Sequence, residues 1–203
     1  PYLKTDCLTR RQPSIHNEPF PLALPDHARM LVTALNDALE KEGIQTGIAV
    51  ADAKAIFPGL KVYDDKPELS IKLLKAFAYY CIRYTPVIAI DPPDGLILDA
   101  TGCSQLWGGD LLYTTTIINR LKSFGYDVKG AMADTIGTAW AVTRFDETKI
   151  VIQNKEQYFA LLFLPPAALR LEQDTLELLH KLGLRQIQHF IGMPRSALKR
   201  TFG

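Results

Sequence analysis

The chain has 203 residues, of which 47% are hydrophobic, and its formal net charge is +1. This length can bury one substantial core or two to three small subdomains, and the near-neutral charge means that any nucleic-acid surface must be local. The three cysteines are an odd number without a C-x-x-C pair, which excludes a disulfide framework and favours reduced thiols.

Prolines and glycines divide the first third of the chain. Residues 1–25 hold five prolines and little periodicity, so we predict an extended loop there. An apolar stripe predicts a helix that begins at Asp26, a plausible N-cap, and ends near Gly43. A second short helix is expected over 51–56.

The middle of the chain alternates helices and strands. We predict helices over 68–84, 110–124 and 135–144, and strands over 87–90, 96–99, 128–133 and 150–153. This order is typical of an α+β domain in which helices cover one face of a sheet. Beyond Pro165-Pro166, short helices are expected over 173–182, 185–191 and 195–202.

The turn between the first two strands carries the most informative motif, which reads Asp91-Pro92-Pro93-Asp94-Gly95-Leu96-Ile97-Leu98-Asp99-Ala100-Thr101. It resembles the palm motif of Y-family (DinB/UmuC-type) DNA polymerases. In that register Asp94 falls on the first of the family's paired acids, and Gly95 replaces the catalytic glutamate. Mg²⁺ takes oxygen ligands and Gly has no side chain, so the resemblance implies a two-metal site that has lost an acid.

A second region resembles the fingers of the same family. Gly43-Ile44-Gln45-Thr46-Gly47 matches the fingers signature in order and spacing. Just upstream, Asp37 and Glu40 occupy the positions of the Tyr and Arg that hold the incoming triphosphate in the family. An acid in place of an Arg repels a triphosphate, so the resemblance implies that nucleotide binding is lost.

A third region, residues 130–141, resembles a palm motif whose two lysines are replaced by Thr135 and Ala139. One of those lysines meets the triphosphate in the family, and here both cations are gone. We therefore expect no catalytic residue and no cofactor. Mg²⁺ is expected only if polymerase activity survives, with Asp94 as the one retained palm acid.

The chain is basic from residue 180 onward and holds no acid there. Leu182-Gly183-Leu184 resembles the hairpin of the helix-hairpin-helix in the polymerase thumb. Such a hairpin is expected to point backbone N–H groups at a phosphate, and Gly lets the backbone approach closely. The expected DNA-contacting residues are Lys181, Gly183, Leu184, Arg185, Arg195, Lys199 and Arg200.

The order and spacing of these motifs resemble in particular the catalytically degenerate, ImuB-like branch of the Y family. The resemblance implies the end of a first palm strand at 1–5, helical fingers at 6–67, a ferredoxin-like palm at 68–160 and a helix-hairpin-helix thumb at 165–203. We interpret the chain as a fragment. Proteins of this branch meet a sliding clamp, a RecA-like mutagenesis partner and an error-prone polymerase through regions outside it.

Three hypotheses follow. The first is a non-catalytic adaptor in DNA repair and SOS mutagenesis, which binds DNA and brings an error-prone polymerase to lesions. The alternative is an active translesion polymerase in which Asp94 pairs with an acid on the missing first strand, since Asp91 and Asp99 are not expected to substitute. The third is a ferredoxin-like domain unrelated to polymerases.

The sequence also bears on location. It has no apolar run near the roughly 20 residues that span a bilayer, and it shows no secretory signal. We therefore predict a cytoplasmic protein with no membrane partner, and the family resemblance implies that it is bacterial and nucleoid-associated.

Overall fold

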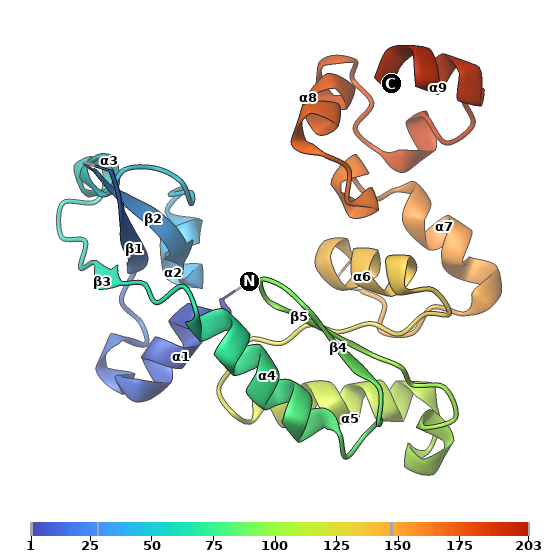
Figure 1. Cartoon of the computed structure of the whole chain (residues 1–203), viewed down its shortest axis with the longest axis horizontal. Helices are drawn as coiled ribbons and strands as arrows, with labels where there is room; N and C mark the ends of the chain where they lie inside the picture. Colours follow the sequence, from blue (N-terminus) through green and yellow to red (C-terminus); the bar gives the residue numbers. More distant parts are fainter. Residues whose placement is uncertain (1, 28, 147, 203) are drawn as a thin grey trace. The chain divides into compact units, whose positions relative to one another are not determined.

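The computed structural model describes residues 2–27, 29–146 and 148–202 and shows helices mixed with small sheets (Figure 1). The predicted α+β class is confirmed. The chain divides into two compact units, of which the first contains the chain up to Thr101 with Asn119–Val128. The second contains Gly102–Ile118 and the chain from Lys129 onward. The limits given above for fingers, palm and thumb remain predictions.

The chain starts with a helix rather than the end of a palm strand. Helix α1 (Leu3–Arg11) is followed by the 3-10 helix η1 (Pro13–Ile15). The strand predicted over 1–5 is therefore wrong from Leu3 onward, and Pro1 lies outside the described residues. The sequence favours a helix here because it has no β-branched run, an acid in the first turn and two arginines in the last.

A small sheet replaces most of the helix that we predicted from Asp26 to Gly43. Strands β1 (Pro21–Asp26) and β2 (Arg29–Leu35) are antiparallel, and β3 (Tyr63–Asp64) pairs in parallel with β1. Helix remains only in α2 (Asp37–Lys41). A short apolar run fits both periodicities, and pairing with β1, which the local pattern does not reveal, decides for a strand.

Asn36 marks the change from strand to helix. Its Oδ1 accepts the N–H groups of Phe20 (3.0 Å) and Leu39 (3.2 Å), and its Nδ2 donates to the carbonyl of Glu18 (2.8 Å). This buried side chain caps α2 and so fixes where the helix begins. The acids of the helix, Asp37 and Glu40, are exposed. The apolar cluster beneath consists of Val32, Leu35, Leu39, Ile44, Ala53 and Leu60.

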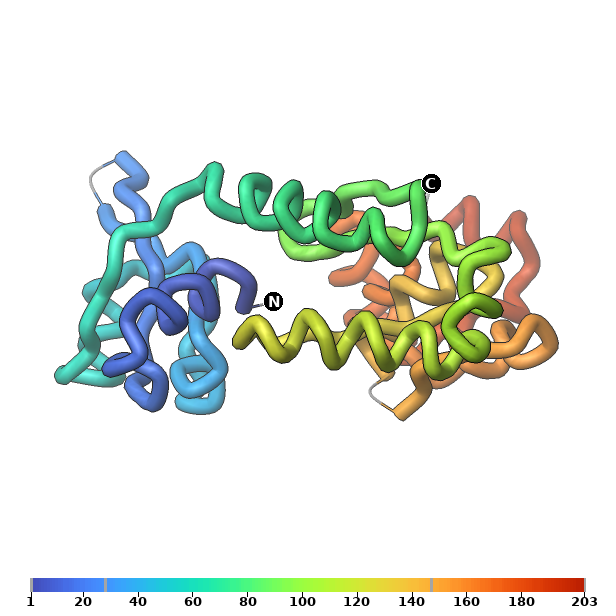
Figure 2. The backbone as a smooth tube through the Cα atoms, turned by 90° about the horizontal axis from the view of Figure 1, so that it is seen from below, coloured from blue at the N-terminus to red at the C-terminus, as the bar shows by residue number. Residues whose placement is uncertain are grey.

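Most elements of the middle region agree with the prediction. They are α3 (Val50–Ile56), α4 (Leu69–Cys81), β4 (Ile88–Asp91), β5 (Gly95–Leu98) and α5 (Asp110–Lys122). Strands β4 and β5 pair antiparallel, and α4 packs along the hairpin that they form (Figure 2). This hairpin holds the Asp94 turn.

The strands predicted over 128–133 and 150–153 are wrong. A single parallel bridge between Met132 and Val151 takes their place. The backbone at Gly130 passes so close to Ile118 that an added Cβ would lie 3.1 Å from it, and a glycine inside a short run weakens a strand. Among the described residues, the strands predicted for the palm are thus reduced to the β4–β5 hairpin in the first unit and this isolated bridge in the second.

Short helices make up most of the second unit. The α-helices are α6 (Ile136–Phe145), α7 (Gln157–Leu162), α8 (Gln173–Lys181) and α9 (Arg195–Phe202). The 3-10 helices are η2 (Ser104–Trp107), η3 (Asn154–Glu156), η4 (Pro166–Leu169) and η5 (Ile187–His189). Helices α6, α8 and α9 confirm the prediction, whereas the segment 185–191 forms only η5.

The cores of this unit are modest in size. The largest cluster of buried residues consists of Ala141, Leu164, Ala168, Leu179, Ile187 and Phe190. It joins α6 to the helices from η4 to η5, so the basic C-terminal segment rests on a defined apolar base. Within the described residues, no helix is both long enough and apolar enough to cross a membrane.

Candidate functional site

The β4–β5 turn presents one acid where the palm motif of the family has two. Asp91 pairs with Gly95 across the hairpin, and Asp94 lies half-buried in the three-residue turn between them. Gly95 starts β5 and contributes only backbone. Asp99 lies beyond β5, where its Oδ1 accepts the N–H of Thr101 at 2.9 Å. Hydrogen bonds from the Thr101 side chain and then from its backbone lower the pKa of Asp99.

These residues do not fit a two-metal site. Two Mg²⁺ ions held by carboxylates need several oxygen ligands, and Asp94 brings one side chain. Among the residues that the structure describes, no group of three or more His, Cys, Asp and Glu side chains lies close enough to hold a metal ion. Asp99 closes a local turn beyond β5 through its Oδ1, and its expected lack of a role at a metal stays a prediction.

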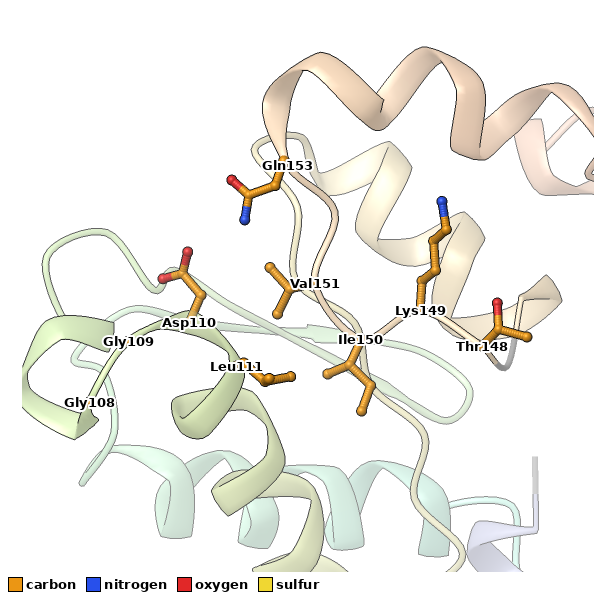
Figure 3. A pocket seen from close by; sticks show the side chains of 9 residues that line it. All are labelled: Gly108, Gly109, Asp110, Leu111, Thr148, Lys149, Ile150, Val151 and Gln153. Atoms are coloured by element: carbon orange, nitrogen blue, oxygen red, sulfur yellow. The ribbon is translucent and has the colours of Figure 1, made fainter.

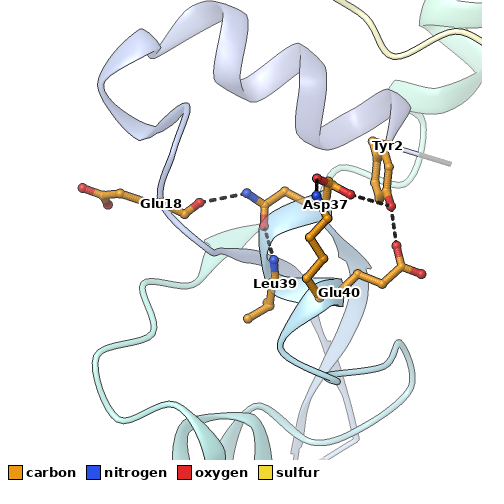
Figure 4. Close-up of polar contacts among 7 residues, drawn as sticks. Tyr2, Glu18, Asp37, Leu39 and Glu40 are labelled. Carbon is orange, nitrogen blue, oxygen red and sulfur yellow. Dashed lines mark hydrogen bonds and ion pairs between the residues drawn. The ribbon is translucent and has the colours of Figure 1, made fainter.

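The acids of α2 are engaged by the protein itself (Figure 4). The Tyr2 hydroxyl donates to Glu40 Oε2 at 2.5 Å and lies 3.5 Å from Asp37 Oδ1. Lys41 Nζ forms an ion pair with Asp37 at 2.5 Å. Burial, the hydrogen bond to Glu40 and the negative charges of Glu40 and Asp37 all raise the pKa of Tyr2. The phenol thus stays protonated, and this corner of the fold presents negative charge.

Thr135 and Ala139, the two positions of lost lysines, have structural roles in α6. Thr135 is the N-cap, because its Oγ1 accepts the N–H of Thr138 at 3.3 Å, and it also donates to Gln157 Oε1 at 2.9 Å. Ala139 is half-buried, and its carbonyl accepts the hydroxyl of Thr143 at 2.7 Å. Neither side chain carries a charge that could meet a phosphate.

The turn after α8 does not point its backbone N–H groups outward, which corrects our expectation for the Leu182-Gly183-Leu184 hairpin. Leu182 donates to Leu178 at 3.0 Å, Gly183 to His180 at 3.0 Å and Leu184 to Leu179 at 2.9 Å. Arg185 donates to Gly183 at 3.1 Å. Gly183 has φ +74°, so the turn is a left-handed C-cap of the Schellman type that uses these N–H groups for α8.

The basic side chains around this turn are nevertheless available to solvent. All five are exposed, and no hydrogen bond or ion pair within the described residues holds their charged groups. They are Lys181, Arg185, Arg195, Lys199 and Arg200. Leu198 and Phe202 of α9 pack on the apolar cluster of the unit, while Arg195, Lys199 and Arg200 of the same helix stay exposed.

Comparisons with known proteins agree with these features. The model of the impB/mucB/samB (IMS) family matches residues 4–144, which is more than half of the chain. The chain belongs to the impB/mucB/samB family. Protein ImuB of Caulobacter vibrioides is 38% identical over 161 residues, which make up 79% of this chain and 35% of ImuB. This family member therefore spans about a third of the curated relatives that it matches.

Solved structures show the same fold. DinB from Sulfolobus solfataricus superposes with a TM-score of 0.79 at 15% identity, covering 100% of this chain and 61% of that one. The insertion ternary complex of Dbh DNA polymerase gives the same values. At this identity the likeness concerns the fold alone. The resemblance to Y-family polymerases, and to the ImuB-like branch in particular, is confirmed.

One hollow of this impB/mucB/samB family member lies in the second unit (Figure 3). Its volume is about 590 Å³, and its lining comes from Gly108, Gly109, Asp110, Leu111, Thr148, Lys149, Ile150, Val151 and Gln153. Figure 3 shows the Lys149 ammonium pointing away from the Asp110 carboxylate. With one acid and one distant cation, the hollow has no constellation for acid–base or metal chemistry.

The corrected role of Gly183 gives a first prediction. Gly183→Ala should lower the free energy of unfolding of the second unit by about 1–2 kcal/mol, because an L-residue is strained at positive φ. Affinity for duplex DNA at fixed salt should change little, since the N–H groups of this turn serve α8. Urea unfolding and fluorescence anisotropy would measure the two effects.

Gly192→Ala is the matched control, because Gly192 has no positive φ and open space around it. A large loss of DNA affinity in Gly183→Ala without a loss of stability would show that the turn backbone contacts phosphate after all.

Sequence reasoning missed Tyr2. It lies just before α1, 38 positions from Glu40 along the chain, and no local spacing connects the two. The available signal in the sequence was that two acids, Asp37 and Glu40, stand at positions where the family binds phosphate. Such carboxylates need hydrogen-bond donors from elsewhere in the chain.

Proposed function

We propose that this protein is a non-catalytic adaptor of DNA damage tolerance that binds DNA and brings a separate error-prone polymerase to lesions. The observation that carries the proposal is the state of Glu40. At a position where the family holds a triphosphate with Arg, this chain has a carboxylate that accepts a hydrogen bond from its own Tyr2. A triphosphate would meet repulsion here, and the nearby acid of α2 adds to it.

Independent losses support the same proposal. Gly95 offers no metal ligand, and Thr135 and Ala139 offer no cation. A single replacement would suggest a variant enzyme, whereas replacements in the metal site and in both phosphate-binding regions suggest that selection for catalysis has ceased. The exposed cations after residue 180 supply a surface for the DNA phosphate backbone. Such contacts bind DNA independently of its base sequence.

The remaining partners are proposed from the family. A sliding clamp, a RecA-like mutagenesis protein and an error-prone polymerase would bind regions outside this chain, and the protein would act at the bacterial nucleoid. The relatives are about three times longer than the part matched here, so these partners belong to the whole protein.

An active translesion polymerase is the second candidate. Asp94 favours it, since this acid keeps its place at the hairpin turn and could serve a metal together with an acid from a first palm strand. The solved structures that share the fold include Dbh DNA polymerase, and this fold agrees with either candidate.

Primer extension separates the two candidates. With Mg²⁺ or Mn²⁺, the full-length protein should add no nucleotide while it still binds primer–template DNA. Gly95→Glu should also remain inactive, because Asp37 and Glu40 would still oppose a triphosphate. Nucleotide addition that disappears in Asp94→Ala but persists in Asp52→Ala, a change of an exposed acid in α3, would make the protein an enzyme.

A further inference from the structure

An exposed basic and aromatic surface lies in the first unit, away from the residues discussed so far. It is formed by the C-terminal half of α4, the residues just after it and the end of α5. We call it the Tyr80 face, and its residues are Tyr79, Tyr80, Ile82, Arg83, Arg120 and Phe124.

Two arginines are held in place at the centre of this face. Arg83 Nε donates to the Tyr80 carbonyl at 2.9 Å, and its guanidinium carbon lies 3.7 Å from the centre of the Tyr80 ring. Arg120 Nε donates to the Tyr80 hydroxyl at 2.8 Å and lies over Phe124. These contacts use one N–H of each guanidinium. Among the described residues no carboxylate pairs with either arginine, although both are exposed.

The charge around the Tyr80 face is one-sided. Lys75 on α4 and Lys122 on α5 are exposed and lie within the same helical segments. Glu68 lies at the other end of α4, where it pairs with Lys72 at 2.9 Å. The hydrogen bond from Arg120 lowers the pKa of Tyr80, which agrees with an excess of positive charge at the centre of the face. A ligand for this surface must bring negative charge.

Exposed apolar groups lie beside these cations. Tyr79 near the end of α4 is 80% exposed, and Ile82 just after the helix is 54% exposed and precedes Arg83. Guanidinium groups lie over the rings of Tyr80 and Phe124, so these two rings are not open for stacking with a nucleic-acid base. Tyr and Arg next to apolar side chains are typical of the centres of protein interfaces.

We propose that the Tyr80 face binds an acidic segment of a partner protein. Asp or Glu carboxylates of the segment would accept the remaining N–H groups of Arg83 and Arg120, and an apolar side chain between them would lie against Tyr79 and Ile82. This interaction goes beyond the adaptor role proposed above and does not depend on DNA binding by the C-terminal cations.

The probe is a set of fluorescent peptides of about 12 residues, in which Glu pairs at each spacing flank Leu or Phe. Peptides with Gln in place of Glu and a single-stranded oligo(dT) serve as comparisons, all with the full-length protein at about 0.1 M salt. At least one Glu peptide should bind about tenfold more tightly than its Gln counterpart. Equal binding of the Glu and Gln peptides would overturn the proposal.

Variants locate the binding. Arg83→Gln with Arg120→Gln should weaken the Glu peptide about tenfold, and the two Arg→Lys changes should weaken it too, because Lys lacks the planar fork. Lys54→Gln with Lys66→Gln has the same change of charge at exposed positions outside the Tyr80 face, and it should have less than about a twofold effect. An equal loss in both pairs, or tighter binding of oligo(dT) that depends on Arg83 and Arg120, would contradict a protein ligand.

A measurement on the unchanged protein guards against misfolded variants. Phenylglyoxal modifies exposed arginines, and mass spectrometry would follow its reaction with Arg83 and Arg120. The bound Glu peptide should protect both, while Arg185 in the second unit should react as before. Absence of protection at saturating peptide would overturn the proposal.

Discussion

Replacing Lys4 with Met should lower the free energy of unfolding of the first unit by about 3–5 kcal/mol, one of the two largest effects that we expect. Lys4 pairs with Asp65, whose side chain is 2% exposed. The same carboxylate oxygen accepts the hydroxyl of Thr33 at 2.6 Å, while the other oxygen, Oδ1, has no hydrogen-bond partner within the described residues. Without Lys4 the buried negative charge would lose its compensating cation.

The double change Lys4→Met with Asp65→Leu is the control. It removes both charges together, and apolar replacement of a whole buried pair is often close to neutral, so most of the stability should return. Urea unfolding followed by circular dichroism would measure both variants. Trp107 and Trp140 belong to the second unit, so their fluorescence gives a separate transition. A loss below about 1 kcal/mol in the single variant would show that water already solvates Asp65.

Lys199→Ala with Arg200→Ala should weaken binding to duplex DNA on the order of 50-fold at about 0.1 M salt. Both residues lie at the exposed side of α9, and each phosphate contact releases about one counterion. The slope of log affinity against log salt should fall in magnitude by about two, and the loss should be similar for unrelated sequences. Anisotropy titrations over a range of salt concentrations would give both quantities.

Lys54→Ala with Lys66→Ala is the matched control, since both lysines are exposed in the first unit and the net charge changes equally. This variant should keep nearly the full slope. An unchanged slope in the Lys199 and Arg200 variant would remove the C-terminal helices from the DNA interface.

The fold could be predicted where local signals agree. Pro58-Gly59 follows α3, Pro92-Pro93 lies in the turn of the β4–β5 hairpin, and Gly108-Gly109 precedes α5. The periodicity of the residues next to these turns indicates each element without ambiguity. The helix predicted over residues 29–35 was wrong because the apolar spacing there fits a helix and a strand equally. The strand that decides between them is β1, and its two prolines lower the strand propensity of that segment.

The candidate site could be predicted only as a set of losses. Gly95, Glu40, Thr135 and Ala139 stand out because their residue types differ from those of the family motifs, and this comparison needs no geometry. What the lost positions do now depends on long-range contacts such as those of Tyr2, which no local pattern contains. The direction of the backbone N–H groups in the turn at Gly183 could not be predicted either. A Leu-Gly-Leu sequence is compatible with N–H groups that point to solvent and with N–H groups that cap the preceding helix.

The inward cap at Gly183 has a consequence for movement. A backbone nest would hold one phosphate at one register, whereas long Lys and Arg side chains can exchange one phosphate for the next with little change in energy. A protein that touches DNA only through such side chains would diffuse along the strand and pause where another factor holds it. The position at which it stops on DNA would then be determined by the factor that binds it there and not by its own contacts with the phosphates.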